Sequence, residues 1–378
     1  MKFKAIFLTA LFFIFTLEGF ESQYPVDITF LVADLKYNQK DGVKICEIQH
    51  GIASAFSGDR YSHGEPGIIP ENFYLTLLQY QNEFWTTHNN FSEAQIKNQL
   101  MASPEWHVLD HLPAVERNAF FLQQAALPVE DPTNIQSYHG CICTRKWVLN
   151  KHRKFMKKYP GIILIDEASI PYWEDKYKMS MLFSRNENLS SFKPRWHLYK
   201  KEYDAQLAQK IIEEIKSDWF VIKPRSSYLG NGVIIVNQED LDETLRYILI
   251  KSRQLDKDPD NSYNYWYKDR SHTFLVEEFI ASDPLCIPHL DNQLYQPTMR
   301  VAFICAYHNR EIDLHILGAY WKLPRLSLSD EGTLNEKHKN CGKIPYFYRV
   351  DPETLREVEK QLHVALPLLY KEMLIAEN

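Results

Sequence analysis

Residues 220–236, with the sequence FVIKPRSSYLGNGVIIV, constrain the fold of this chain more than any other segment. Two apolar, β-branched runs flank a short loop of Ser, Gly and Asn, a pattern that predicts an antiparallel hairpin. Lys223 ends the first strand, and Gly230 and Gly232 permit a tight backbone path. A strand-borne ammonium and a loop of backbone N–H groups suit the phosphates of a nucleotide, although an ordinary hairpin with one lysine has the same pattern.

The rest of the sequence predicts both short strands and helices, which favours the α+β fold class. Apolar, β-rich runs predict strands at 26–33, 43–48, 162–165, 274–280, 299–306 and 314–321. Leucine and isoleucine at four-residue spacing predict a helix over 203–216, and a last helix is expected over 355–374, where Pro367 should kink or shorten it. Residues 76–160 are predicted to be mainly helical, and the polar stretch 251–272 to be a loop or an insertion.

The composition is that of a globular protein of two to three domains. The chain has 378 residues, at about 150 per domain, with 45% hydrophobic and 24% charged residues. The formal net charge of −6 argues against a general nucleic-acid-binding protein, which should be basic. The 6 cysteines are scattered, which is typical of neither a disulfide framework nor a zinc site.

The first residues have the pattern of a secretory signal peptide. Lys2 and Lys4 precede an uncharged, mostly apolar run from Ala5 to Leu17. The run is short for a membrane span, which needs about twenty residues. A cleaved leader over 1–22 is therefore predicted, with a buried N-terminal segment as the alternative, and no membrane span is expected in the mature chain.

Six motifs follow one another in an order that is more specific than any of them alone. They are Asp175-Lys176, the 220–236 hairpin, FLVEEFI at Phe274–Ile280, a strand with Arg300, Trp321-Lys322, and the Asn- and Gly-bearing loop Asn335–Gly342. The series resembles the ATP-grasp superfamily of carboxylate–amine ligases. Residues 299–350 look most like the ribosomal-protein glutamate ligases and the D-alanine ligases. The resemblance implies an α+β ATP-grasp fold, in which two subdomains enclose ATP.

The resemblance also implies a role for individual residues. Two lysines would contact ATP, Lys176 and Lys223. A mobile loop would cover the phosphates, formed by Ser226, Ser227, Gly230, Asn231 and Gly232. The adenine and ribose would be held by Glu277, Glu278, Phe279, Ile280 and Thr298. The catalytic residues at the γ-phosphate or acyl phosphate would be Arg300 and Lys322, and the substrate side would be lined by Asn335 or Asn340.

The magnesium-binding hairpin departs from the family's order. In the family it follows the last helix, whereas this chain stops at Asn378, where the hairpin should begin. The segment at 26–51 instead offers Asp34 on one strand, and Glu47 and Gln49 on one face of the next. Two carboxylates and an amide oxygen suit Mg²⁺, with Gln in place of the family's commoner Asn. We therefore predict a circularly permuted ATP-grasp fold, with a plain first hairpin of an α/β domain as the alternative.

The predicted activity is ADP-forming ligation of a small-molecule or peptide carboxylate to an amine or thiol, with ATP and Mg²⁺ and through an acyl phosphate. Phosphoryl transfer on the same fold, or an exported binding protein without catalysis, are the alternatives. The expected parts are the signal peptide at 1–22, the metal-binding hairpin at 23–55, a substrate-side domain at 56–165 and the nucleotide-binding subdomains at 166–378. The leader favours export and ATP favours a compartment that supplies it, so localisation stays open.

Overall fold

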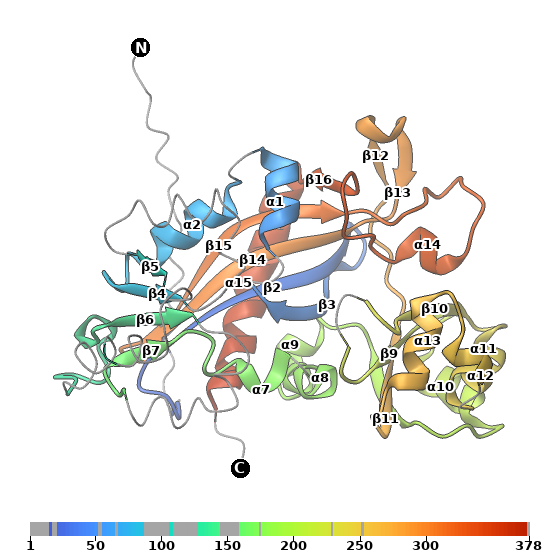
Figure 1. The fold of residues 1–378 in the computed structure, drawn as a ribbon, viewed down its shortest axis with the longest axis horizontal. Helices are drawn as coiled ribbons and strands as arrows, with labels where there is room; N and C mark the ends of the chain where they lie inside the picture. Colours follow the sequence, from blue (N-terminus) through green and yellow to red (C-terminus); the bar gives the residue numbers. More distant parts are fainter. Residues whose placement is uncertain are drawn as a thin grey trace.

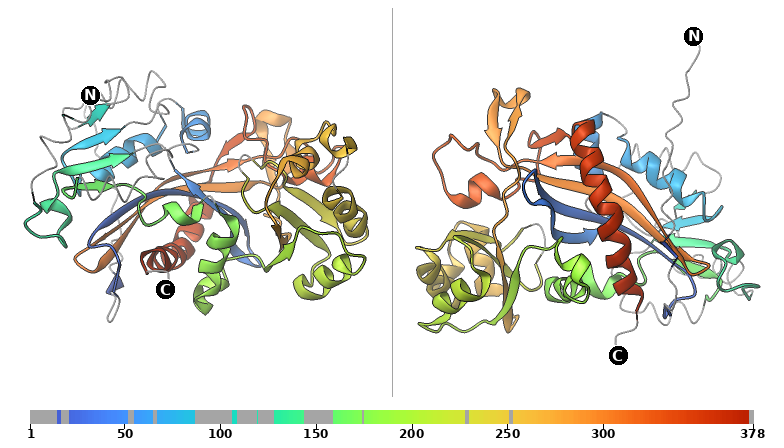
Figure 2. Two further views of the ribbon diagram at one scale, coloured as in Figure 1. Left: turned by 60° about the horizontal axis from the view of Figure 1, so that its bottom comes forward. Right: turned by 180° about the vertical axis from the view of Figure 1, so that it is seen from behind.

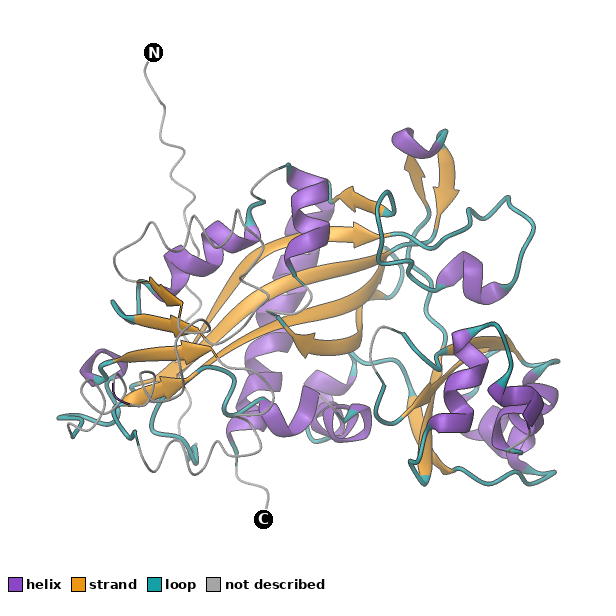
Figure 3. Ribbon diagram, in the orientation of Figure 1, coloured by secondary structure: helices purple, strands orange, loops and turns teal. Residues whose placement is uncertain are grey.

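The computed structural model describes a mixed α+β protein with several antiparallel sheets (Figures 1 and 3). The described residues are 15–16, 21–51, 55–64, 67–86, 106–108, 119, 128–143, 159–173, 175–227, 230–250 and 253–375. Most of the predicted signal peptide lies outside them. Within it, β1 (Phe15–Thr16) pairs with the edge of β15. No helix among the described residues is long and apolar enough to cross a membrane.

A central sheet joins the two ends of the sequence. Its order is β1-β15-β14-β2-β3, with β16 also paired to β15, and all pairs are antiparallel. The strands are β2 (Asp27–Asn38), β3 (Gly42–His50), β14 (Thr298–His308), β15 (Glu311–Lys322) and β16 (Phe347–Arg349). The predicted first hairpin is thus confirmed, and the strands predicted at 299–306 and 314–321 form a second hairpin. The strand β2 of the first pairs with β14 of the second.

Helices cover both faces of this sheet (Figure 2). One face packs on α8 (Lys176–Ser184), α9 (Glu187–Ser190) and α15 (Pro352–Leu374), and the other on α1 (Phe56–His63) and α2 (Ile69–Leu77). Alternate residues of β2 enter the two cores: Leu31 and Leu35 lie in the first, Phe30 and Val32 in the second. Burial on both faces explains the continuous apolar run from Phe30 to Ala33 in the middle of β2.

The C-terminal helix α15 continues past Pro367, where the sequence predicts a kink or an earlier end. Pro367 lies inside it and is buried, so the expectation that Pro367 would shorten it is wrong. Asp351 caps the helix by accepting a hydrogen bond from the Thr354 backbone N–H, and Pro352 occupies the first turn. Packing of the buried side chains against the sheet outweighs the lost backbone bond.

A second antiparallel sheet has the order β10-β9-β11-β8. Its strands are β8 (Trp196–Lys200), β9 (Trp219–Pro224), β10 (Ile234–Asn237) and β11 (Thr273–Glu278), packed against α10 (Leu207–Ile215), α11 (Leu241–Leu249) and α13 (Asn261–Lys268). The expected loop at 251–272 is wrong, because it contains α12 (Arg253–Asp256) and α13. Asp260 caps α13, and the Asp and Asn residues that favour loops also favour helix N-termini.

A third sheet is parallel and adjoins the central sheet. Its order is β5-β4-β6-β7, from β4 (Phe84–Thr86), β5 (Trp106–Val108), β6 (Gly140–Cys143) and β7 (Ile162–Leu164). The helical prediction for 76–160 is therefore wrong for its described parts, and the remainder lies outside the described residues. The remaining elements are α7 (Ile170–Trp173), the projecting hairpin β12 (Leu285–Ile287) and β13 (Gln293–Tyr295), α14 (Leu334–His338), and two 3₁₀ turns at Ile135–Ser137 and Pro288–Leu290.

Candidate active site

A cavity of about 820 Å³ lies between the central sheet and the second sheet. Residues from both sheets and from the segment after β15 line it. Most of the predicted site residues are among them: Asp34, Glu47, Gln49, Lys176, Lys223, Gly230, Asn231, Glu277, Glu278, Phe279, Ile280, Thr298, Arg300, Lys322 and Asn340. Segments far apart in the sequence therefore bring their predicted residues to one place.

Asp34 holds two predicted catalytic cations. It lies opposite Arg300 in the β2–β14 register, and Arg300 donates from Nε to Oδ1 at 2.8 Å and from Nη2 to Oδ2 at 2.7 Å. Lys322, from the next strand, donates to Oδ2 at 3.0 Å. Burial raises the pKa of Asp34, but the two cations outweigh it and hold the pKa well below its ordinary range. Asp34 is therefore ionised at neutral pH.

Glu47 faces the cavity beside Asp34, on the adjoining strand. The two residues are directly paired in the β2–β3 register, and Lys176 Nζ lies 2.9 Å from Glu47 Oε1. Burial raises the pKa of Glu47, but Lys176 outweighs it, so the pKa lies below its ordinary value. Lys176 also donates to the backbone carbonyl of Ser227. This lysine at the start of α8 thereby connects the first hairpin to the glycine-bearing loop.

The three residues predicted to hold magnesium lie within hydrogen-bond distance of one another. Gln49 Nε2 donates to Asp34 Oδ2 at 3.3 Å and to Glu47 Oε2 at 2.6 Å. Carboxylate and amide oxygens are the ligands that Mg²⁺ takes. No group of three or more His, Cys, Asp or Glu that could hold a metal occurs among the described residues. A metal here would therefore need the Gln49 amide or water to complete its ligands.

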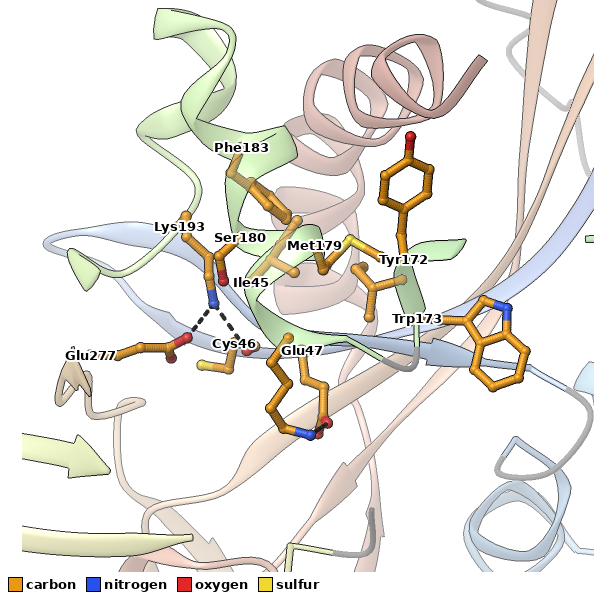
Figure 4. Close-up of a pocket in the computed structure, with 12 residues that line it drawn as sticks. Ile45, Cys46, Glu47, Tyr172, Trp173, Met179, Ser180, Phe183, Lys193 and Glu277 are labelled. Atoms are coloured by element: carbon orange, nitrogen blue, oxygen red, sulfur yellow. Dashed lines mark hydrogen bonds and ion pairs between the residues drawn. The ribbon is translucent and has the colours of Figure 1, made fainter. Parts of the chain in front are cut away.

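Glu277 pairs with two buried lysines on the opposite side of the cavity. Lys223 Nζ lies 2.5 Å from its Oε2, and Lys193 Nζ lies 2.7 Å from its Oε1. Both ammonium groups also donate to the backbone carbonyl of Cys46, at 3.3 and 3.2 Å. Figure 4 shows Lys193 between Glu277 and Cys46, beside a small cavity of about 20 Å³, which has the size of a water molecule.

Lys193, which lines the small cavity and pairs with Glu277, is a residue that the sequence reasoning missed. Its only signal is a repeated tripeptide, because Lys193-Pro194-Arg195 and Lys223-Pro224-Arg225 share one sequence. Burial raises the pKa of Glu277, but the two lysines outweigh it and keep the carboxyl ionised, with its pKa below the ordinary value. One charge therefore remains in excess at this position, which suits an anionic ligand.

Four predicted residues do not line the cavity. They are Ser226, Ser227, Gly232 and Asn335. The Asn335 side chain instead accepts a hydrogen bond from the backbone N–H of Ile235 at 2.8 Å, which ties α14 to β10. Gly232 has a φ of +72° and its carbonyl accepts from the Trp266 indole, so its role is to shape the loop. Neither residue is therefore placed to contact a substrate in the cavity.

Other lining residues carried no signal in the sequence. Lys36, two positions after Asp34 on β2, is buried and donates to the backbone carbonyl of Pro297 at 3.0 Å; burial lowers its pKa to about 8. His338 packs edge-on against Phe279, with ring centroids 5.0 Å apart, and burial lowers its pKa to about 4. Further lining cations are Arg325, Lys339 and Lys343. Isolated charged residues in loops are usually solvated, so they cannot be distinguished by sequence.

Comparisons with known proteins give only distant similarity. No protein-family model matches the chain, and no curated protein matches it. Among solved structures, it is similar to a D-cycloserine synthetase at 11% identity and a TM-score of 0.32, over 61% of this chain and 66% of that chain, just under two thirds of its length.

Two further synthetase structures are similar at the same level. The D-alanyl-alanine synthetase A of Vibrio cholerae has 11% identity and a TM-score of 0.37, over 76% of this chain and 82% of that chain. A glutathione synthetase-like effector from Globodera pallida, in its apo form, has 13% identity and a TM-score of 0.41, over 82% and 76%. Scores this low carry no argument about activity, which has to come from the residues of this chain.

Proposed function

We propose that this protein is an ATP- and Mg²⁺-dependent, ADP-forming carboxylate–amine ligase with a circularly permuted ATP-grasp fold. The observation that carries the proposal is the pairing of β2 with β14. It sets Asp34, Glu47 and Gln49 of the first hairpin beside Arg300 and Lys322, in a cavity that Lys223 and Glu277 face from the other sheet. A plain first hairpin has no reason to bring its acids to these cations.

ATP would bind across the two sheets. Its phosphates would lie among Lys176, Lys223, Arg300 and Lys322, and the strand end Glu277–Ile280 would hold the adenine and ribose. All of these residues line the cavity. The volume of about 820 Å³ lies within the range of pockets that bury small molecules. Thr298, at the start of β14 and opposite Lys322, would contribute at the ribose side.

Asp34, Glu47 and Gln49 would hold Mg²⁺. The bound ion would neutralise charge on the phosphates and leave the transferring phosphorus open to attack. The residues would change partners when MgATP binds, because Asp34 now accepts from Arg300 and Lys322, and Glu47 from Lys176. The ion pairs within the site would thus be replaced by pairs between the same cations and the phosphates. The cations would therefore not be left buried without a counter-charge.

The proposed reaction has two steps. A carboxylate oxygen of the substrate attacks the γ-phosphorus, the bond to the β-phosphate oxygen breaks, and ADP leaves with that electron pair. The amine then attacks the acyl carbon, phosphate leaves, and the amine loses a proton. Arg300 and Lys322 stabilise the charge on the transferring group and hold the carboxylate in line. The Gly230–Gly232 loop excludes water, which would hydrolyse the acyl phosphate.

Thermal unfolding of the full chain tests the proposal. The unfolding midpoint of the wild type should rise with ATP and Mg²⁺ together, since a ligand at 100 times its Kd adds roughly 2.7 kcal/mol of stability. Glu47→Gln should keep the fold and lose the magnesium-dependent part of the rise. Glu202→Gln, at an exposed acid outside the cavity, is the matched control and should retain all of it. No rise in the wild type under any condition would refute an ATP site.

The products separate ligation from phosphoryl transfer. With hydroxylamine as the amine and a panel of carboxylates, a ligase forms a hydroxamate together with equal amounts of ADP and phosphate. A phosphotransferase forms ADP and a phosphorylated product without free phosphate. ATP binding without turnover of any member of the panel would favour a binding protein over an enzyme.

A further inference from the structure

A tripeptide on the surface has the sequence that receives N-linked oligosaccharide in secreted proteins. Asn188-Leu189-Ser190 is an Asn-x-Ser sequence without proline at its middle position. The chain has a second one, Asn90-Phe91-Ser92, which lies outside the described residues. Asn188 lines neither of the two cavities described above, so it has no part in the proposed function.

The fold presents Asn188 to solvent. It lies in α9, a single helical turn in which Leu189 is fully buried, whereas Glu187, Asn188 and Ser190 are exposed. Leu189 packs in the core that α8 and α15 share with the central sheet, so the turn is anchored on its inner side. An oligosaccharide is bulky and hydrophilic, and on Asn188 it would extend into water without displacing a core side chain.

The Asn188 amide is available for modification. The Asn188 backbone N–H donates to the Asn186 side chain at 3.0 Å, but the Asn188 side chain forms no hydrogen bond with the described part of the chain. The cap of α9 is Asn186, whose side-chain oxygen accepts from the backbone N–H groups of Asn188 and Leu189. The start of the helix therefore needs Asn186, whereas it does not need the Asn188 side chain.

The predicted signal peptide supplies a route to the modifying enzyme. N-linked oligosaccharide is added in the lumen of the endoplasmic reticulum, and a chain enters this lumen through a leader of the kind predicted at 1–22. The leader and the tripeptide are independent features of the sequence that indicate the same compartment. An acceptor asparagine is modified only in a translocated chain, so the modification also reports on the leader.

We propose that Asn188 carries an N-linked oligosaccharide. The co-substrate is a lipid-linked oligosaccharide. The amide nitrogen of Asn188 attacks the first sugar carbon, the bond from that carbon to the lipid diphosphate breaks, and the lipid diphosphate leaves with the electron pair while the amide loses one proton. The transferring enzyme requires the hydroxyl of Ser190. The inference does not rest on the proposed function, and an unmodified Asn188 would leave the ligase proposal untouched.

Cell-free translation of the full chain with microsomes of the endoplasmic reticulum tests the inference. The variant Asn90→Gln leaves Asn188-Leu189-Ser190 as the only acceptor sequence. It should show one upward shift in apparent mass, which an endoglycosidase for N-linked oligosaccharide removes. Asn188→Gln or Ser190→Ala in the same background should abolish the shift, whereas Ser190→Thr keeps an acceptor hydroxyl and should retain it.

Ser191→Ala is the matched control. The Ser190 hydroxyl donates to the Glu187 carbonyl at 2.8 Å, and the Ser191 hydroxyl donates to the Asn188 carbonyl at 3.0 Å. The two exposed serines thus make the same backbone contact one residue apart, and only Ser190 belongs to the acceptor sequence. Ser191→Ala should therefore keep the full shift. The oligosaccharide is added before the chain folds, so a folding defect in a variant would not imitate the loss of the acceptor.

Protection from added protease separates the possible failures. A chain that stays outside the microsomes and is digested would overturn the inference together with the predicted leader. A protected chain without the shift would overturn the modification and leave the leader standing. A shift that persists in Asn188→Gln would place the oligosaccharide at another residue and would also overturn the inference.

Discussion

Asp34 and Arg300 face each other across β2 and β14 and form a two-point ion pair, with donor–acceptor distances of 2.8 and 2.7 Å. Both side chains are almost fully buried. The pair therefore joins the first hairpin to the C-terminal strands by charge, in addition to the backbone hydrogen bonds of the sheet. It also positions the guanidinium at the wall of the cavity.

Removal of the negative charge at this pair should destabilise the fold. Asp34→Asn leaves Arg300 and Lys322 as buried cations without a counter-charge, and we expect the free energy of unfolding in urea to fall by about 3–5 kcal/mol. Glu357→Gln, which breaks the exposed pair with Lys360, should change it far less. Equal losses of unfolding free energy in the two variants would show that the buried pair contributes no more to stability than the exposed pair.

Loss of the Lys223 ammonium should weaken ATP binding and spare the fold. Lys193 still pairs with Glu277 in Lys223→Met, so that carboxylate keeps a counter-charge. One charge-assisted contact to a phosphate is lost, and the Kd for ATP should rise about tenfold or more in calorimetry. Lys200→Met changes an exposed lysine of the same sheet and is the control. An unaltered Kd for ATP in Lys223→Met would show that this lysine does not contact the nucleotide.

The stability of the protein should fall as the pH rises toward 8 because of Asp27. Burial raises its pKa from 3.8 to about 8, while Tyr370 donates to the carboxyl at 2.6 Å. Between these pH values the folded protein keeps a proton on Asp27 that the unfolded chain has released, so a rising pH favours unfolding.

Asp27→Asn cannot titrate and should remove this part of the pH dependence. Urea unfolding at pH 5, 6.5 and 8 would measure it. The stability of the wild type relative to Asp27→Asn should decrease steadily across the series. A constant difference between the two proteins would mean that Asp27 is ionised throughout.

The two glycines of the loop after β9, Gly230 and Gly232, should differ in their tolerance of alanine. Both have a positive φ, +69° at Gly230 and +72° at Gly232. A Cβ on Gly232 would lie 2.4 Å from Pro224 Cγ, whereas a Cβ on Gly230 would meet only the flexible end of Lys339, at 3.1 Å. Gly232→Ala should therefore lower the free energy of unfolding by about 1–3 kcal/mol more than Gly230→Ala. Similar costs for both would place the strain in the backbone alone.

The sequence predicts those parts of the site that lie on long, apolar strands. The hairpin that carries Asp34 and Glu47 was predictable because its strands have period-two or continuous apolar patterns. The turn at Asn38–Gly42 sets the register only as far as Leu35, and a shift between Leu35 and Asp34, which the sequence did not predict, pairs Asp34 with Glu47. Lys223 was visible for the same reason, at the end of β9. Alternation along a strand fixes which side chains share a face, so the positions of Glu47 and Gln49 could be deduced before any contact was known.

Two of the shortest strands and the contacts across loops could not be predicted. The strands β4 and β5 have three residues each, too few to show a period, whereas β7 is part of the wholly apolar run predicted as a strand at 162–165. The helix α13 begins in a stretch of Asp and Asn that also favours loops. The contact between Lys193 and Glu277 could not be predicted either. Lys193 lies in the short connection between α9 and β8, which has no hydrophobic pattern of its own.

The pairing of β2 with β14 has a consequence for the order in which the ribosome delivers the chain. The hairpin of β2 and β3 leaves the ribosome first, whereas β14, β15 and the covering helix α15 are made last. Until then the hairpin has an unpaired edge and an apolar surface without a cover, a state that invites intermolecular pairing. Closing a contact over so many residues also costs loop entropy and slows folding. The nascent protein therefore has to keep this strand, which is buried on both faces in the finished fold, from aggregating until almost all of the chain has been made.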